Sequence, residues 1–356
     1  MILTSRGVAN SGQSNPAVSG CIRVLGLLGA ALCVSLSAYA QMAHEPMVFE
    51  NNAVGGPRLL EEGQPLAIVH PTVEDAQRGR GPNARAGGAA STTSDLSYHG
   101  GTGGVGVETT PMIVLVLWGS QWTNNDPTGE ASILQSFYSG VGGSSWLNSV
   151  TQYCQGVASG TFFCNGSGAP AGNQAGMLVG VWYDSAAPAP AHPKQSQIAS
   201  EAVQAAAYFG FKAAGANANV QYVIATARGS SSSGFGRQYC AYHSSTNSSY
   251  GNIAYTNLPY ITDAGASCGA NFNGLGPKAG ITIVSGHELA ETISDQFPTT
   301  GWSDSNGAEN GDKCAWIASG QGASANATFS TGVFPVQSLW SNAFNSGAGG
   351  CVLSYP

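Results

Sequence analysis

The chain has 356 residues, a formal net charge of −7, and charged side chains at only 9% of its positions. This length fits one large domain or two small ones. Because basic residues are few, the sequence offers no positive patch for nucleic acid or an anionic membrane, and we expect neither as a partner.

Residues 1–40 are typical of an export signal. An apolar run at 24–40 follows Arg23 and ends with the small residues Ala38 and Ala40, spaced as signal peptidases require. The run is too short to cross a bilayer stably. We therefore expect a secreted, extracellular protein, or one held in the periplasm or cell wall, with no membrane segment after cleavage.

Residues 41–95 differ in composition from the rest. They carry most of the arginines that follow the signal, and the stretch 77–94 is rich in Gly, Ser and Arg. Such composition is typical of flexible, protease-sensitive chain. We interpret 41–95 as a flexible leader. The alternative is a propeptide that is cut near Arg80 or Arg85.

Residues 96–356 are expected to form one domain. Four apolar runs rich in Val and Ile are typical of buried strands; they lie at 112–119, 176–183, 220–227 and 280–285. Helices are predicted by capping signals and three- to four-residue apolar spacing; they lie at 131–141, at 196–215 and over the segment that follows the last strand. We predict an α+β domain with a mixed sheet, with α/β as the alternative.

Six cysteines remain after cleavage at residue 40. An even number in an exported chain indicates disulfide bonds, and six cysteines allow fifteen pairings. We predict that sequence neighbours pair and stiffen the long loops; the predicted pairs are Cys154–Cys164, Cys240–Cys268 and Cys314–Cys351. The alternative is that some of the six are free, buried thiols.

The third predicted helix carries the sequence His-Glu-Leu-Ala-Glu at 287–291. It matches the H-E-x-x-H helix of zinc peptidases (zincins), except that Glu291 replaces the second histidine. Positions i and i+4 share one helix face, so His287 and Glu291 can bind one ion. In zincins the glutamate beside the first histidine is the general base, and we assign this catalytic role to Glu288.

An acidic cluster supplies further candidate ligands. Six of the twelve acidic residues beyond residue 96 lie between 288 and 312. Glu309 and Asp312 are candidates for a third ligand. His243 is a candidate fourth ligand, or a catalytic residue that stabilises an oxyanion; the alternative is a structural histidine. The stretch 304–312 could instead form a calcium-binding loop, although its spacing is not that of an EF-hand.

The expected cofactor is a divalent metal ion. Exchanging an imidazole for a carboxylate makes the ligand set harder and more anionic. Zinc accepts Asp and Glu ligands and is our first choice. Calcium and manganese compete better at such a site than at one with two histidines.

Several segments occur together in an order that resembles one family. They are Tyr98-His99-Gly100-Gly101, VLVLWGSQW at 114–122, FGRQYCAYH at 235–243, VSGHELAET at 284–292, ENGDKC at 309–314 and VQSLWSN at 336–342. This series resembles the exordium-like, or phosphate-induced protein 1, family, whose plant members are secreted apoplastic proteins. The resemblance implies an exported, disulfide-bonded single domain with glutamate at position 291. It implies no established reaction.

Two functions follow as hypotheses. The first is a secreted, monomeric, metal-dependent hydrolase, similar to a metallopeptidase, that acts on extracellular protein. The alternative is a non-catalytic secreted protein that binds cell-wall polysaccharide or a surface partner and uses the ion structurally. A third possibility is a degenerate enzyme that keeps a zincin-like fold without an ion.

Overall fold

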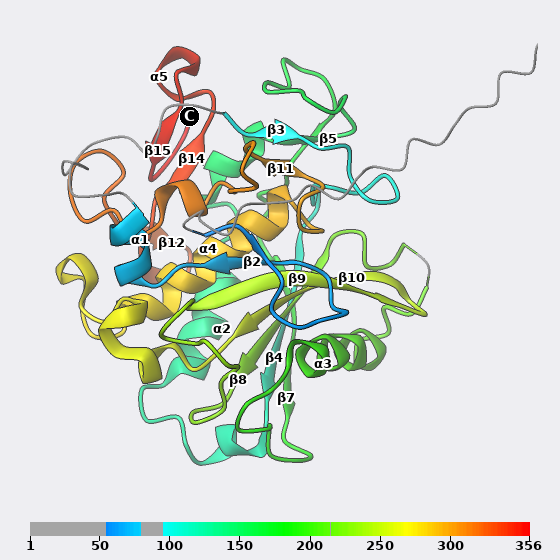
Figure 1. The fold of residues 1–356 in the computed structure, drawn as a ribbon, viewed down its shortest axis with the longest axis vertical. Helices are drawn as coiled ribbons and strands as arrows, with labels where there is room; N and C mark the ends of the chain where they lie inside the picture. The colour runs from blue at the N-terminus through cyan, green and yellow to red at the C-terminus, as the bar shows by residue number, and fades with distance from the viewer. Residues whose placement is uncertain (1–54, 80–94, 214) are drawn as a thin grey trace, which may run out of the picture. The chain divides into compact units, whose positions relative to one another are not determined.

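The computed structural model describes residues 55–79, 95–213 and 215–356 (Figure 1). The predicted signal peptide 1–40 lies outside the described residues. So do residues 41–54 of the predicted leader, and Arg80 and Arg85, the alternative sites of propeptide cleavage.

A seven-stranded mixed sheet forms the centre of the domain. Its order is β1 (Pro57–Arg58), β2 (Ala67–His70), β9 (Ala241–Ser248), β10 (Gly251–Leu258), β8 (Val220–Thr226), β4 (Met112–Trp118) and β7 (Leu178–Asp184). The strands from β10 to β7 pair in parallel, whereas β1, β2, β9 and β10 pair antiparallel. The α+β expectation and the first three predicted strands are therefore confirmed.

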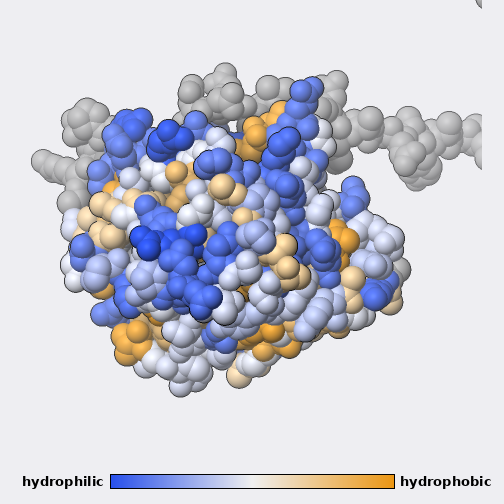
Figure 2. All heavy atoms as spheres, turned by 90° about the horizontal axis from the view of Figure 1, so that it is seen from below, coloured by the Kyte–Doolittle hydropathy of each residue, from blue (hydrophilic) through white to orange (hydrophobic). Residues whose placement is uncertain are grey.

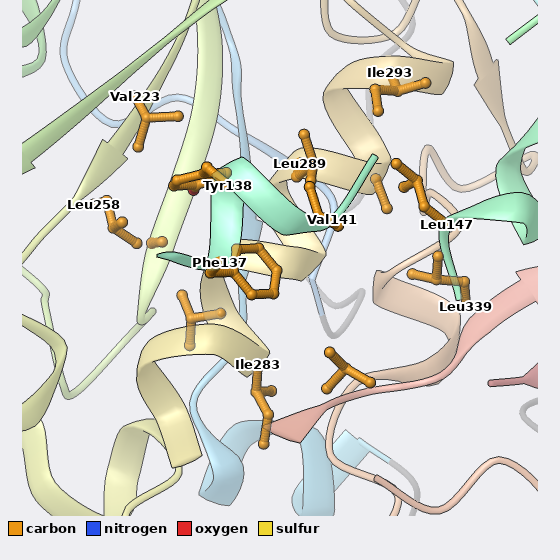
Figure 3. Packing of buried hydrophobic residues seen from close by; sticks show 14 of the residues in the cluster. Phe137, Tyr138, Val141, Leu147, Val223, Leu258, Ile283, Leu289, Ile293 and Leu339 are labelled. Atoms are coloured by element: carbon orange, nitrogen blue, oxygen red, sulfur yellow. The ribbon is translucent and has the colours of Figure 1, made fainter. Parts of the chain in front are cut away.

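Helices cover both faces of this sheet. Successive side chains of β4 point to opposite faces. Leu115 packs in one core with α2 (Glu130–Gly140) and α4 (Ala279–Ser294), and Val116 packs in a second core with α3 (Gln195–Tyr208). Figure 3 shows Phe137 of α2 among side chains of α4 and the sheet. The predicted helix at 196–215 ends early, because Gly210 turns the chain with a left-handed φ of 83°.

One predicted strand is wrong. Residues 280–285 form the first turns of α4, and every residue of this helix is buried. A helix that is buried on all sides carries apolar residues all round instead of in one stripe. Periodicity cannot distinguish a short run from such a helix from a buried strand.

Residues 55–79, which belong to the predicted leader, form regular secondary structure. Strand β2 pairs with β9, so that Ile68 lies opposite His243. All four residues of β2 are fully buried. The short helix α1 (Val73–Gly79) follows. The apolar sequence AIVH at 67–70 is short, and the Gly- and Arg-rich composition of the residues that follow masks its strand signal.

The three predicted disulfides are confirmed: Cys154–Cys164, Cys240–Cys268 and Cys314–Cys351. Such bonds are typical of an oxidising compartment. No helix among the described residues is long and apolar enough to span a bilayer.

The remaining elements are short and surround the core. The strands are β3 (Ser97–Tyr98), β5 (Cys154–Gln155), β6 (Ala169–Pro170), β11 (Trp302–Ser303), β12 (Ala325–Phe329), β13 (Gly332–Val336), β14 (Leu339–Ser341) and β15 (Gly350–Val352). The helical turns are η1 (Ser120–Thr123), η2 (Leu147–Gln152), η3 (Ile261–Cys268), η4 (Phe272–Gly274), η5 (Asp312–Cys314) and α5 (Phe344–Gly347).

Candidate metal centre

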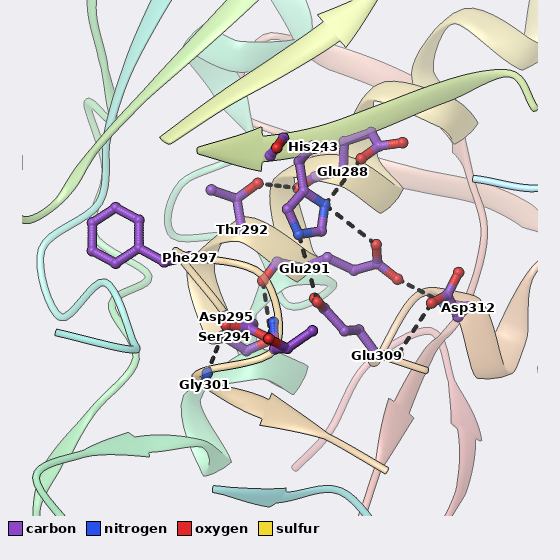
Figure 4. A network of polar contacts seen from close by, with 12 residues as sticks. His243, Glu288, Glu291, Thr292, Ser294, Asp295, Phe297, Gly301, Glu309 and Asp312 are labelled. Carbon is purple, nitrogen blue, oxygen red and sulfur yellow. Dashed lines mark hydrogen bonds and ion pairs between the residues drawn. The ribbon is translucent and has the colours of Figure 1, made fainter. Parts of the chain in front are cut away.

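Three parts of the fold bring the six predicted site residues together. They are α4, strand β9, and the loop that leads into η5 together with the first residue of η5, which we call the ligand loop. The residues are His287, Glu288 and Glu291 from α4, His243 from β9, and Glu309 and Asp312 from the ligand loop. Figure 4 labels His243, Glu288, Glu291, Glu309 and Asp312 of this set. All six side chains are fully buried. We call this set the metal centre.

His287 directs one ring nitrogen at two carboxylates. Its Nδ1 lies 3.3 Å from Oε1 of Gln337, whose own amide nitrogen donates to the Gly311 carbonyl at 2.8 Å. Because Gln337 Oε1 can only accept, His287 Nδ1 carries the hydrogen and Nε2 keeps its lone pair. That Nε2 lies 3.1 Å from Oε2 of Glu291 and 3.8 Å from Oδ1 of Asp312. A lone pair facing a carboxylate is unfavourable unless a cation or a proton lies between them.

His243 lies among three glutamates. Its Nδ1 is 3.2 Å from Oε2 of Glu288 and 3.6 Å from Oε2 of Glu291, and its Nε2 is 3.5 Å from Oε1 of Glu309. With the Nδ1 hydrogen donated to Glu288, the Nε2 lone pair faces Glu309. A carboxylate on the far nitrogen is the usual way to orient a metal-binding histidine.

Among the residues that the structure describes, two groups of three have the spacing to hold a metal ion, and Glu291 belongs to both. One is His243, Glu291 and Glu309; the other is His287, Glu291 and Asp312. Their facing atoms have no hydrogen-bond partner; these atoms are Nε2 of both histidines, Oε2 of Glu291, both carboxylate oxygens of Glu309, and Oδ1 of Asp312. Glu288 belongs to neither group.

The spacing suits a small cation. Donor atoms about 2.1 Å from zinc in a tetrahedron lie about 3.4 Å from one another. The facing pairs range from 3.1 Å, between His287 and Glu291, to 3.8 Å, between His287 and Asp312. Small side-chain movements would therefore let each group supply three ligands to such an ion.

A cation would also stabilise the buried carboxylates of the centre. Burial raises the pKa of Glu288 and of Glu291 to about 7. Burial and neighbouring carboxylates hold the pKa values of Glu309 and Asp312 well above their usual range. Burial lowers the pKa of His287 to about 3, so this imidazole is neutral. The ion pairs that the structure describes for these four carboxylates are formed with His243 and His287.

Hydrogen bonds between side chains and backbone groups hold the ligand loop, which carries Glu309 and Asp312, against α4. The Asp312 N–H donates to Oε1 of Glu291 at 2.8 Å. The Asn310 side chain donates to the Ala290 carbonyl at 3.0 Å. Gly311 allows this approach, because a Cβ there would lie 2.6 Å from Nδ1 of His287. The chain beyond this loop is fixed by the disulfide at Cys314.

The other two acids of the cluster are structural. Asp295 accepts the backbone N–H groups of Thr299 and Gly301, at 2.8 and 2.6 Å. Asp304 pairs with Lys313 at 3.1 Å and accepts a backbone N–H within its own loop. These contacts favour a structural turn over the alternative of a calcium-binding loop.

Sequence reasoning missed His70, which belongs to the supposed leader. Its ring centroid lies 4.0 Å from that of His287. Its Nδ1 lies 2.9 Å from the Pro71 carbonyl, so that nitrogen carries the hydrogen, and the buried Nε2 has no hydrogen-bond partner. Gly55 at the start of the same segment packs directly against Asp312. The segment 55–79 thus covers the metal centre.

No protein-family model, curated protein or solved structure matches this chain. The resemblance to the exordium-like family therefore stays a prediction, and the function is argued from the centre itself.

Proposed function

We propose that the protein is a secreted metal-dependent hydrolase with a metallopeptidase-like centre. The observation that carries this proposal is the pair of buried histidines whose Nε2 lone pairs face carboxylate oxygens. Disulfides and buried ligand groups together are compatible with a secreted metal-binding protein. The resemblance to the exordium-like family points to the same extracellular setting.

The donor set favours zinc and, after it, manganese. Each group of three contains one imidazole nitrogen. Calcium and magnesium are bound in proteins through oxygen ligands, whereas imidazole suits the transition metals. Calcium, which competed on sequence grounds, is therefore disfavoured by the grouping of the ligands.

Glu288 is the proposed general base. A bound divalent cation would polarise a carbonyl oxygen and lower the pKa of a water molecule. Glu288 lies beside the ligands without belonging to either group, as a base requires. Its pKa of about 7 suits proton transfer near neutral pH. The sequence leaves His243 as either a ligand or a catalytic residue. Its position suits a ligand better, because Glu288 accepts its Nδ1 hydrogen and so orients the ring, and its Nε2 faces Glu309.

A second candidate function is favoured by the burial of the centre. No side chain of the metal centre is exposed, so a polymer cannot reach it without movement of the covering segment 55–79. A non-catalytic protein with a structural ion fits this burial. Exposed Tyr208 stacks on Trp182 with ring centroids 4.6 Å apart, and the exposed aromatic surface of this pair would be the contact for cell-wall polysaccharide. The face drawn in Figure 2 is mostly hydrophilic, with separate small hydrophobic groups.

The Glu288→Gln variant separates these two functions. Glutamine keeps the acceptor for His243 Nδ1 but cannot act as a base. For a hydrolase, the zinc-loaded wild type cleaves members of a peptide library and Glu288→Gln loses at least about 100-fold in rate. Both proteins keep the same metal content. The control is Glu108→Gln, which changes a buried carboxyl outside the centre and should keep full activity.

Equal activity in wild type and Glu288→Gln would sink the assignment of the base. Absence of cleavage by any metal-loaded form, with normal metal content and a loss of folding in His287→Ala, would favour the non-catalytic function.

A further inference from the structure

We infer that the metal centre binds two transition-metal cations at once, and that the carboxylate of Glu291 bridges them. This inference rests on the proposed metal centre, and it changes the class of chemistry that the centre can perform. Two-metal sites hold their ions about 3.5–4 Å apart and stabilise both the attacking and the leaving oxygen of a hydrolysis.

The first argument is the division of the histidines. No group of three among the described residues contains both His243 and His287, and each histidine has its own carboxylate partner. His243 faces Glu309, whereas His287 faces Asp312. A single ion would have to leave one buried imidazole and one carboxylate without a partner, which is costly inside a protein.

The second argument is the position of Glu291. Its Oε1 is occupied by the Asp312 N–H at 2.8 Å. Its Oε2 has no hydrogen-bond partner and lies 3.1 Å from His287 Nε2 and 3.6 Å from His243 Nδ1. Glu291 is thus the carboxylate common to both groups of described residues, and Oε2 is its oxygen that no hydrogen bond occupies. The helix supplies it one turn after His287, so its place between the two ions is fixed by α4.

The third argument is charge. Four carboxyl groups, Glu288, Glu291, Glu309 and Asp312, are fully buried within the centre. One dication would leave two negative charges buried, whereas two dications offset all four. Buried charge without a counter-charge costs several kcal/mol per ion. Charge balance therefore favours two cations when all four carboxyls are ionised.

The test is metal stoichiometry on the full chain, purified from an oxidising host without chelator and dialysed against excess Zn²⁺ or Mn²⁺. We expect two equivalents in the wild type by elemental analysis. His243→Ala and Asp312→Asn should each keep one equivalent, and Glu291→Ala should lose both. Glu108→Gln, a buried carboxyl outside the centre, is the matched control and should keep two.

Electron paramagnetic resonance of the Mn²⁺-loaded protein tests the bridge itself. Two bridged ions give an exchange-coupled spectrum in the wild type, and His243→Ala gives the six-line spectrum of an isolated ion. Two equivalents with an uncoupled spectrum would overturn the bridge.

One saturating equivalent in the wild type would overturn the two-cation inference and leave the proposed hydrolase intact. No bound metal would overturn both. Because these outcomes concern the wild type, they hold even where a variant fails to fold.

Discussion

The Nε2 atom of His287 lies 3.1 Å from Oε2 of Glu291, one turn further along α4, and neither atom has a hydrogen-bond partner. The hydrogen of His287 is on the other nitrogen, held by Gln337. Where Glu291 is ionised, this arrangement is electrostatically unfavourable in the metal-free protein, and a cation between the two atoms would remove the repulsion. The predictions below follow from that relationship and from the burial around it.

Metal removal should destabilise the protein. A ligand that binds only the folded state adds about 4 kcal/mol at a concentration a thousand times its Kd. We expect calorimetry to show a lower melting temperature after treatment with a chelator, restored by added Zn²⁺. The Glu291→Ala variant should melt at the same temperature with and without chelator. An identical melt for chelated and zinc-loaded wild type would contradict this prediction.

Metal affinity should increase with pH up to about 7. In the metal-free protein, burial raises the pKa of Glu291 to about 7, so the folded state holds a proton there below that pH. Metal binding requires the ionised carboxylate and must release this proton. Zinc titration by calorimetry at about pH 6, in two buffers of different ionisation enthalpy, should detect proton release. A binding enthalpy that does not depend on the buffer would argue against it.

Stability should also depend on Glu108, far from the centre in sequence. Burial raises its pKa to about 8, and Gln221 donates to its Oε2 at 2.9 Å. Because the folded pKa lies above the unfolded one, Glu108 supports folding fully below about pH 4.5 and loses that support as pH rises through about 8. Glu108→Gln stays neutral, so it should be more stable than wild type at about pH 9.

The expected gain exceeds about 1.4 kcal/mol, because the pKa is raised by more than one unit. Urea unfolding of both proteins at about pH 5 and pH 9 measures it. Glu62→Gln makes the same chemical change at an exposed position and serves as the control. Equal shifts in the two variants would show that the effect does not come from the buried carboxyl.

The segment 55–79 should stay bound after the chain is cut at Arg80 or Arg85. Strand β2 pairs with β9, and Trp316 donates its indole N–H to the Pro71 carbonyl at 2.7 Å. After brief trypsin treatment, the N-terminal fragment should co-elute with the domain in gel filtration and separate only on denaturation. Release of the fragment together with new hydrolase activity would instead support the propeptide alternative.

The sequence predicted those elements whose signals are local. Strands β4 and β8 carry Val- and Ile-rich runs with clear ends, and the bounds of both strands agree with the predicted runs to within one residue. The pairing of neighbouring cysteines also rests on short separations along the chain. Glu288 and Glu291 could be placed on one helix because they lie within a single helical turn of the motif.

What the sequence could not show depends on contacts between distant segments. Glu288 meets His243 from 45 positions away, and His70 reaches His287 from a segment whose composition suggests flexible chain. The apolar start of α4 resembles a strand because the helix is buried on every side. The division of the ligands into two groups that share Glu291 likewise follows only from three-dimensional positions.

The most direct test of a cation centre is anomalous X-ray diffraction from crystals of the zinc-loaded full chain, with data collected above and below the zinc absorption edge. We predict an anomalous peak between His287 Nε2 and Glu291 Oε2 that disappears below the edge. Density for a direct hydrogen bond between those atoms, with no anomalous signal in the metal centre, would contradict the account.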